Sequence, residues 1–173
     1  YINRVMTHML LRDKYRMIAV LDIQENTVFV RKHTFENTEI PCDSPLEYEG
    51  FIRELSEKCI QEKSREWFRT SASLNTMEEN LQVAGIYSFT VYNADRGVER
   101  YTYQWLDKEY REVLIAVEDR TVEMEKDPLT DYLNRDGFVR KTENILKKNA
   151  DRYQFAIIYF NMRKFSGLND VYG

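Results

Sequence analysis

Three short segments with the residue pattern of β-strands follow one another in the middle of the chain, joined by short polar connections. They are residues 86–93, 98–106 and 111–117. In the second segment Tyr101, Tyr103 and Trp105 alternate with polar residues, so their aromatic side chains are expected on one face of a strand. The connections have the residue types of tight turns. This pattern predicts three antiparallel strands joined in sequence, which constrains the fold more than any other feature.

The first half of the chain adds two strand candidates and a helical region. The expected strands are residues 17–22 and 27–32, separated by a polar turn, and shorter helices are expected at residues 64–68 and 76–81. Ser44 and Pro45 are expected to begin a longer helix that ends near Gln61, because serine accepts bonds from free amides and proline fits a first turn. Its apolar face comprises Tyr48, Phe51, Ile52, Leu55, Cys59 and Ile60. The predicted fold class is α+β.

Two amphipathic segments flank this region. Residues 1–13 have apolar side chains at helical spacing, which predicts an N-terminal amphipathic helix. Its apolar stripe either pairs with a second copy of the chain or packs on its own domain, and the sequence leaves both alternatives open. Residues 120–126 predict a short charged helical linker, which would transmit movement to the next domain directly because it is too short for a flexible tether.

Composition excludes several functional classes. The chain has 173 residues and 43% hydrophobic residues, enough for one domain and part of a second. A net charge of −4 without clustered Lys and Arg argues against a nucleic-acid partner. No apolar run approaches the roughly twenty residues that cross a bilayer, so no membrane segment is expected. Cys42 and Cys59 cannot form a disulfide scaffold or a metal cluster alone, so we expect reduced thiols and a cytoplasmic location.

The order of elements, two strands, a helical region and three antiparallel strands, is similar to that of PAS sensor domains. Residues 117–121 (Val-Glu-Asp-Arg-Thr) resemble the D-[IV]-T tail that closes many such domains. The resemblance implies a PAS-like sensor domain at residues 14–119, a homodimer, and a small-molecule ligand contacted from Tyr101, Tyr103 or Trp105. The alternative is that these three side chains form core or dimer contacts. Haem would need His33, which is expected at the surface, and neither cysteine has the context of a photoactive flavin domain.

The last third of the chain contains a second set of motifs. Residues 127–138 read DPLTDYLNRDGF, an apolar run covers 155–160, and then follow NMRKF at 161–165 and NDVYG at 169–173. Together they resemble the opening of a GGDEF domain, the family that makes the bacterial second messenger cyclic di-GMP. Residues 127–173 are therefore expected to be the N-terminal part of an α/β, nucleotidyl-cyclase-like GGDEF domain, with the sequence ending before the loop that names the family. Thr130 is expected to cap a turn and Asn134 to cap a helix, whose inner face is lined by Phe138, Thr142, Ile145 and Leu146. Phe155 to Phe160 is expected to be a strand buried on both faces.

The resemblance also implies a site. It places the first metal-binding aspartate at Asn161, the second at Arg163 and a phosphate-side lysine at Ser166, whereas Asn169 and Asp170 match the family and would bind nucleotide. An amide brings no negative charge to Mg²⁺, and an arginine would repel it. We therefore expect no cofactor for this chain itself. Mg²⁺ and GTP are possible ligands of a complete GGDEF domain.

The expected function is that of a bacterial signalling protein, in which a PAS-like sensory and dimerisation module regulates a GGDEF domain that is weak or inactive as a cyclase. The resemblance also implies regulation of an attached phosphodiesterase of the EAL type, because inactive GGDEF domains often have this role. One alternative is an active diguanylate cyclase in the full-length protein. Another is a structural dimerisation module without a ligand. Whether the protein is an enzyme stays open at this point.

Overall fold

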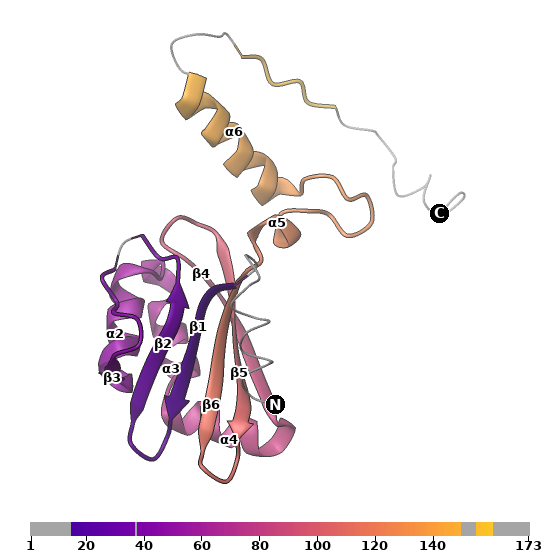
Figure 1. Cartoon of the computed structure of the whole chain (residues 1–173). Coiled ribbons are helices and arrows are strands. Elements are labelled where there is room, and N and C mark those ends of the chain that lie inside the picture. Colours follow the sequence, from indigo (N-terminus) through magenta and orange to yellow (C-terminus); the bar gives the residue numbers. More distant parts are fainter. Residues whose placement is uncertain (1–14, 37, 150–154, 161–173) are drawn as a thin grey trace, which may run out of the picture. The chain divides into compact units, whose positions relative to one another are not determined.

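The computed structural model describes residues 15–36, 38–149 and 155–160 (Figure 1). The chain divides into two compact units, residues 1–137 and 138–173. The first unit is an α+β fold built on an antiparallel sheet. In the part of the chain that the structure describes, no helix is long and apolar enough to cross a membrane. The N-terminal helix expected at residues 1–13 lies outside the described residues.

A six-stranded antiparallel sheet forms the framework of the first unit, with the strand order β3-β2-β1-β6-β5-β4. The strands are β1 (Tyr15–Asp22), β2 (Thr27–His33), β3 (Pro45–Glu47), β4 (Ile86–Tyr92), β5 (Val98–Asp107) and β6 (Glu112–Asp119). Five of them were expected, including the hairpin β1–β2 and the three successive strands β4, β5 and β6. The sequence pattern did not predict that β1 would pair with β6, which joins the two groups of strands into one sheet.

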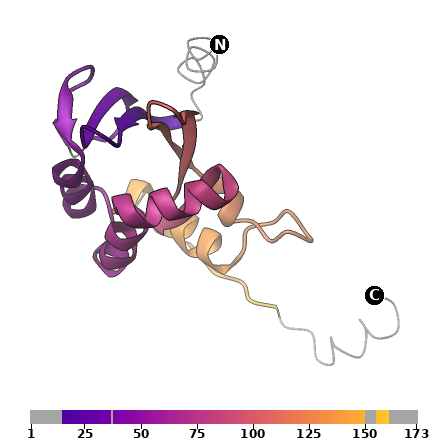
Figure 2. The same ribbon diagram turned by 90° about the horizontal axis from the view of Figure 1, so that it is seen from below.

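Three helices cover one face of this sheet (Figures 1 and 2). They are α2 (Tyr48–Lys58), α3 (Arg65–Ser71), which follows the short 3-10 helix η1 (Glu62–Ser64), and α4 (Leu74–Ala84). The whole expected apolar face of α2 is buried, as are Phe68 of α3 and Met77 and Leu81 of α4. These side chains pack against the inward residues of the sheet in one continuous core. A smaller cluster, Ile18, Leu114 and Ala116, is buried on the other face of the sheet.

The start of α2 differs from the prediction. Ser44 and Pro45 do not begin the helix, because Pro45 opens the edge strand β3, in which Leu46 pairs with Val28. A proline is tolerated there because an edge strand leaves one side of its backbone unpaired. The helix begins at Tyr48, and the Glu47 carboxylate caps it by accepting bonds from the amides of Glu49 (3.0 Å) and Gly50 (2.6 Å).

The last helix of this layer is longer than its apolar pattern indicated. The hydroxyl of Ser73 caps the start of α4 by accepting a bond from the Thr76 amide, and the helix ends at Ala84. Gly85 follows with a positive φ of 74°, the left-handed conformation that glycine adopts at a helix C-terminus without steric cost. The expectation of a helix at residues 76–81 is confirmed, with earlier and later ends.

Beyond the sheet the first unit continues through α5 (Thr121–Met124) into a compact loop. We expected Thr130 to cap a turn there, but Asp127 is the cap. Its Oδ1 accepts bonds from the amides of Leu129 (3.0 Å) and Thr130 (2.9 Å) and from the Thr130 hydroxyl (3.0 Å). A carboxylate offers about four acceptor positions, whereas a hydroxyl offers two. The expected cap at Asn134 is confirmed, since its Oδ1 accepts a bond from the Gly137 amide at 3.0 Å, at the start of α6 (Arg135–Asn149).

In the second unit the structure describes the greater part of α6 and residues 155–160. The expected buried strand at 155–160 is wrong, because these residues have no regular secondary structure and are exposed. A strand needs neighbours to pair with its backbone, and the described residues of this unit contain no other strand. Phe138, Ile145 and Leu146, expected to line an inner face, are 49%, 41% and 43% exposed. No second domain is evident among the described residues.

Candidate binding site

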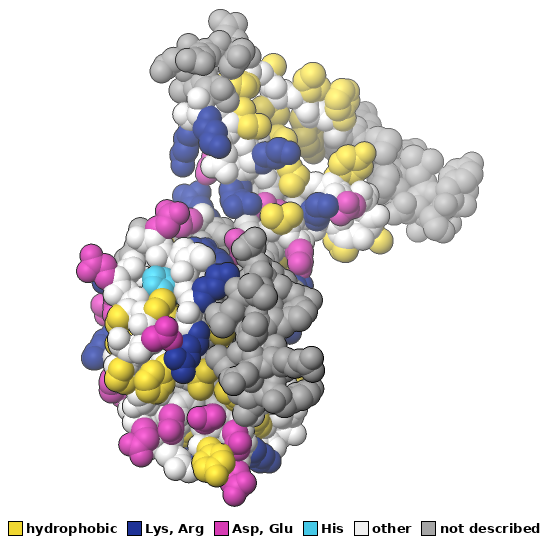
Figure 3. All heavy atoms as spheres, in the orientation of Figure 1, with side chains coloured by type: hydrophobic (Ala, Val, Ile, Leu, Met, Phe, Trp, Pro, Cys, Tyr) yellow, Lys and Arg dark blue, Asp and Glu magenta, His cyan; other side chains and the backbone are white. Residues whose placement is uncertain are grey.

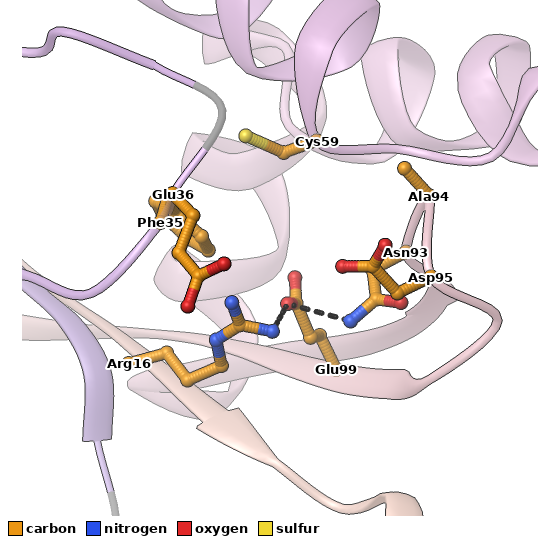
Figure 4. Close-up of a pocket in the computed structure, with 8 residues that line it drawn as sticks. All are labelled: Arg16, Phe35, Glu36, Cys59, Asn93, Ala94, Asp95 and Glu99. Atoms are coloured by element: carbon orange, nitrogen blue, oxygen red, sulfur yellow. Dashed lines mark hydrogen bonds and ion pairs between the residues drawn. The ribbon is translucent and has the colours of Figure 1, made fainter. Parts of the chain in front are cut away.

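A cavity of about 120 Å³ lies beside the first residues of β5 (Figure 4). Its lining comes from β1, the loop after β2, the end of α2 and the β4–β5 hairpin. The lining residues are Arg16, Phe35, Glu36, Cys59, Asn93, Ala94, Asp95 and Glu99. Most of these side chains are polar or charged, so this cavity differs from the aromatic core next to it.

Glu99 is the most buried charged residue of this site, with only 1% of its surface exposed. It lies two positions before Tyr101 in β5, so the alternation of the strand turns it toward the core. Its Oε1 accepts bonds from Arg16 Nη1 (2.8 Å) and Asn93 Nδ2 (3.1 Å), and its Oε2 accepts one from the Tyr101 hydroxyl (3.3 Å). Burial raises the pKa of the Glu99 carboxyl, and the bond from Asn93 and the charge of Arg16 oppose that rise.

Arg16 reaches the inward face because of an irregularity in β1. The pairing of β1 with β6 shifts register between Tyr15 and Met17, so Arg16 is an extra residue at a β-bulge. Strict alternation would place Arg16 on the opposite face from Met17, and a bulge redirects a side chain in this way. The guanidinium lies over the Phe35 ring at 5.2 Å from its centroid and pairs with Glu99. The arginine is thus held by both an aromatic face and a buried carboxylate.

Asn93 connects the cavity to the backbone of the β4–β5 hairpin. Its Nδ2 donates to Glu99, while its Oδ1 accepts a bond from the Gly97 amide at 2.7 Å. Gly97 in turn lies directly against Thr121, since a Cβ built at Gly97 would meet Thr121 Oγ1 at 2.8 Å and Asn93 Nδ2 at 2.9 Å. One side-chain amide therefore links the buried carboxylate to the point where the chain leaves the sheet.

Cys59 lines the cavity from its helical side, as Figure 4 shows. Its burial was expected from its place on the apolar face of α2 and is confirmed. Burial raises the pKa of the Cys59 thiol to about 11, and the nearby Glu99 charge acts in the same direction. The thiol is therefore protonated at neutral pH and is not a nucleophile there, because the thiolate is the reactive form. Cys42 is exposed.

The aromatic residues expected to contact a sensor ligand lie elsewhere. Tyr101 and Tyr103 are fully buried in the core, where both rings stack on Phe89 with centroids 5.5 and 6.0 Å apart. The Tyr48 hydroxyl lies 3.3 Å from that of Tyr103. This is the arrangement of core contacts, the alternative left open by the sequence, and a ligand contact from these rings stays a prediction.

Trp105, the third of these residues, is half-buried at a separate surface hollow of about 470 Å³. Its indole Nε1 donates to the Leu81 carbonyl at 3.2 Å, which fixes the ring against the end of α4. The hollow is otherwise lined by charged and polar side chains: Glu78, Gln82, Lys108 and Arg111. Arg111 and Glu78 form an ion pair across it.

The positions that the GGDEF resemblance assigns to metal and nucleotide, Asn161, Arg163, Asn169 and Asp170, lie outside the described residues. Within the part that is described, no group of His, Cys, Asp or Glu side chains is arranged to hold a metal ion. On the face of the first unit seen in Figure 3, acidic and basic side chains are interspersed. The chain matches no model of a known protein family, and a search of curated proteins returns no match.

Sequence reasoning missed Arg16, Asn93 and Glu99. For Glu99 a signal was present, because it shares the inward side of β5 with Tyr101 and is the only charge on that side of the strand before Asp107. A lone carboxylate on a buried face requires partners. No comparable signal identified Arg16, whose direction depends on the bulge.

Proposed function

We propose that the chain is part of a signalling protein in which a PAS-like sensory and dimerisation module regulates a GGDEF output domain in cyclic di-GMP metabolism. The observation that carries this proposal is the sheet itself. The first strand, β1, lies beside the last strand, β6, and the helical segment between the two groups of strands covers one face. The order of a PAS-like module thus closes into one sheet around one core, and the chain leaves it from the end of β6.

The tail at the end of β6 supports the proposal in detail. The Asp119 carboxylate accepts a bond from the Thr121 amide at 2.8 Å, and the Thr121 hydroxyl accepts one from the Val98 amide at 2.9 Å. The Arg120 amide also donates to the Val98 carbonyl at 2.8 Å. Thr121 of the D-[IV]-T resemblance therefore bonds the exit of the chain to β5, and Asp119 fixes the turn between β6 and Thr121. A change at the start of β5 has a direct route to this exit.

The segment after the tail is also fixed by hydrogen bonds. The Met124 amide donates to the Arg120 carbonyl at 3.0 Å, and Asn134 donates to the carbonyls of Met124 and Glu125, both at 2.7 Å. The loop that carries the DPLT motif is thus bonded directly to the helix that leaves the sensor module. This favours mechanical transmission over a flexible tether, as expected for a short linker.

The proposal of a GGDEF output domain rests on the motifs at residues 127–138 and 155–173. With Asn161 and Arg163 at the two metal positions, we propose a domain that binds GTP through Asn169 and Asp170 and is weak or inactive as a cyclase. Mg²⁺ would meet an uncharged amide and a cation there, in place of two carboxylates.

The test uses the full-length gene product with GTP and Mg²⁺. We expect GTP binding that is lost in Asn169→Ala while the protein stays folded, and cyclic di-GMP formation far below that of a cyclase with both aspartates. Thr121→Val, which removes the acceptor for the Val98 amide, is expected to change GTP affinity, whereas Thr121→Ser is not. Rapid formation of cyclic di-GMP by the wild type would favour the active diguanylate cyclase. Absence of GTP binding would refute the proposal of a GTP-binding GGDEF domain.

One observation favours a second candidate, a structural dimerisation module without a ligand. The aromatic core is filled, since Tyr48, Tyr101 and Tyr103 are each at most 1% exposed. Sedimentation of the chain distinguishes the two functions. A dimer whose association is unaffected by every small molecule tested would support the structural module and contradict the sensor.

A further inference from the structure

The cavity beside Glu99 has the features of a site for a small positively charged ligand. We propose that it binds a small organic cation, a primary ammonium whose charged group lies against the Glu99 carboxylate. The binding site follows from the geometry of the described residues alone. Its role as the site of the sensed stimulus rests on the proposed function.

The charges that line the cavity favour a cation over an anion. Three lining residues are carboxylates, Glu36, Asp95 and Glu99, and one, Arg16, is a cation that already pairs with Glu99. The two rim carboxylates are exposed, while that of Glu99 lies at the buried end (Figure 4). An anionic ligand would meet an excess of negative charge, whereas an ammonium would gain at short range from each carboxylate.

The Glu99 carboxylate retains capacity for a further donor. An ionised carboxylate offers about four acceptor positions. Among the described residues, Oε1 accepts bonds from Arg16 and Asn93, but Oε2 accepts only the long 3.3 Å bond from the Tyr101 hydroxyl. A primary ammonium carries three donors and no acceptor, so it matches a lining whose oxygens outnumber its cations. A divalent metal ion fits less well, because Arg16 repels its double charge more strongly than the single charge of an ammonium, and the described residues offer no cluster of metal ligands.

The volume sets the size of the ligand. At about 120 Å³ the cavity is somewhat smaller than one of ~150 Å³ that accepts benzene, so it suits a molecule of about six non-hydrogen atoms or fewer. The Phe35 ring and the Cys59 thiol provide limited apolar contact for a short carbon chain. A nucleotide or an aromatic cofactor is too large for this site.

The site is placed where occupancy can influence the exit of the chain. An ammonium at Oε2 of Glu99 would share the carboxylate charge with the Asn93 amide, which donates to Oε1, and would weaken that bond. Asn93 also holds the Gly97 amide, and Gly97 lies against Thr121 in the tail. Ligand binding would therefore change the hydrogen bonds that reach the tail.

The experiment titrates the whole chain with ethylammonium chloride at constant ionic strength, followed by calorimetry and by NMR shifts of the Asn93 side-chain amide and the Gly97 backbone amide. Sodium propionate serves as the anion of similar size. We expect saturable ethylammonium binding, in the range of about millimolar for so small a ligand, and no binding of propionate. Propionate binding as tight as that of ethylammonium, or absence of saturable ethylammonium binding, overturns the proposal.

Two variants locate the site. Glu99→Gln keeps the size of the side chain and removes its charge, and we expect it to weaken ethylammonium binding by about tenfold or more. Glu79→Gln, an exposed residue of α4, makes the same charge change away from the cavity and is expected to bind as the wild type does. Unchanged affinity in folded Glu99→Gln contradicts the site. If Glu99→Gln does not fold, the comparison of ethylammonium with propionate in the wild type still tests whether the chain binds a small cation.

The outcomes separate this proposal from the proposed function. Ethylammonium binding that shifts the Gly97 and Thr121 amides and alters association or GTP affinity supports both. Binding without any effect on association or GTP affinity supports the site and refutes its sensory role. Absence of binding refutes the site, and the GTP-binding test of the output half stands independently of it.

Discussion

The buried ion pair between Arg16 and Glu99 gives a quantitative prediction for stability. Arg16→Met keeps an apolar stem over Phe35 but removes the guanidinium, which leaves the Glu99 carboxylate, 1% exposed, without its opposite charge. Breaking a buried pair in this way typically costs about 3–5 kcal/mol. We expect about 3 kcal/mol near pH 7, at the lower end of that range, because the Arg16 side chain is 23% exposed and Asn93 and Tyr101 still donate to the carboxylate.

The loss in Arg16→Met is expected to depend on pH. Burial raises the pKa of Glu99 in the folded state, and removal of the Arg16 charge, which opposes this rise, raises the pKa further. Between the unfolded and the folded pKa the native state binds more protons, so the free energy of unfolding decreases as pH rises. A protonated Glu99 carries no unpaired charge. The difference between variant and wild type is therefore smaller near pH 5 than near pH 7.

Urea unfolding followed by circular dichroism at the two pH values measures this difference. Arg100→Met is the control, because Arg100 follows Glu99 in β5, is exposed on the opposite face and donates to the Ser88 hydroxyl at 3.0 Å. The double variant Arg16→Met with Glu99→Gln removes both charges and is expected to recover part of the loss. An equal loss at both pH values, or a double variant no more stable than Arg16→Met, would refute the reasoning.

Three further predictions concern the tail and the thiols. Thr121→Val leaves the buried Val98 amide without an acceptor and is expected to lower stability by about 1–3 kcal/mol in thermal unfolding, while Thr121→Ser costs less. Gly97→Ala places a Cβ at 2.8 Å from Thr121 Oγ1, so we expect a loss of stability together with NMR shifts at the tail; a neutral effect would show that the close contact is absent. Iodoacetamide near pH 7 is expected to alkylate exposed Cys42 and to spare Cys59 until the protein unfolds, as checked by mass spectrometry; rapid reaction at Cys59 would contradict its raised pKa.

The fold was predictable from the sequence wherever apolar side chains recurred at the spacing of a strand or a helix over six residues or more. The strands β4 and β5 and the helix α2 each have such a pattern, because one of their faces is buried against the core. The strand β6 is instead an apolar run that is buried on both faces. The edge strand β3 has three residues, too few to show alternation, so its Pro45 was interpreted as a helix start. The apolar run at 155–160 shows the converse error. Hydrophobicity alone does not provide the neighbouring strands that a buried strand requires.

The candidate site was harder to predict from the sequence, because its residues are far apart in the chain and come together only when the sheet forms. Arg16 and Glu99 are 83 positions apart, on strands separated by β6. The direction of Arg16 depends on a one-residue bulge, which local sequence does not encode visibly. The regular spacing of Tyr101, Tyr103 and Trp105 suggested a ligand contact, and in the structure it marks the face of β5 that packs in or against the core.

The filled core and the polar cavity together restrict where a small molecule can act on this module. A ligand inside the aromatic core would have to displace close-packed rings such as those of Phe89, Tyr101 and Tyr103, and interiors at this density resist added volume at a cost of typically about 1–3 kcal/mol. The cavity at Glu99 already contains space and unused acceptor capacity, and Asn93 joins it to the tail. Binding there changes a hydrogen-bond network that includes the exit of the chain. For this reason we expect a small molecule to act at the polar cavity where β5 begins, rather than in the aromatic core.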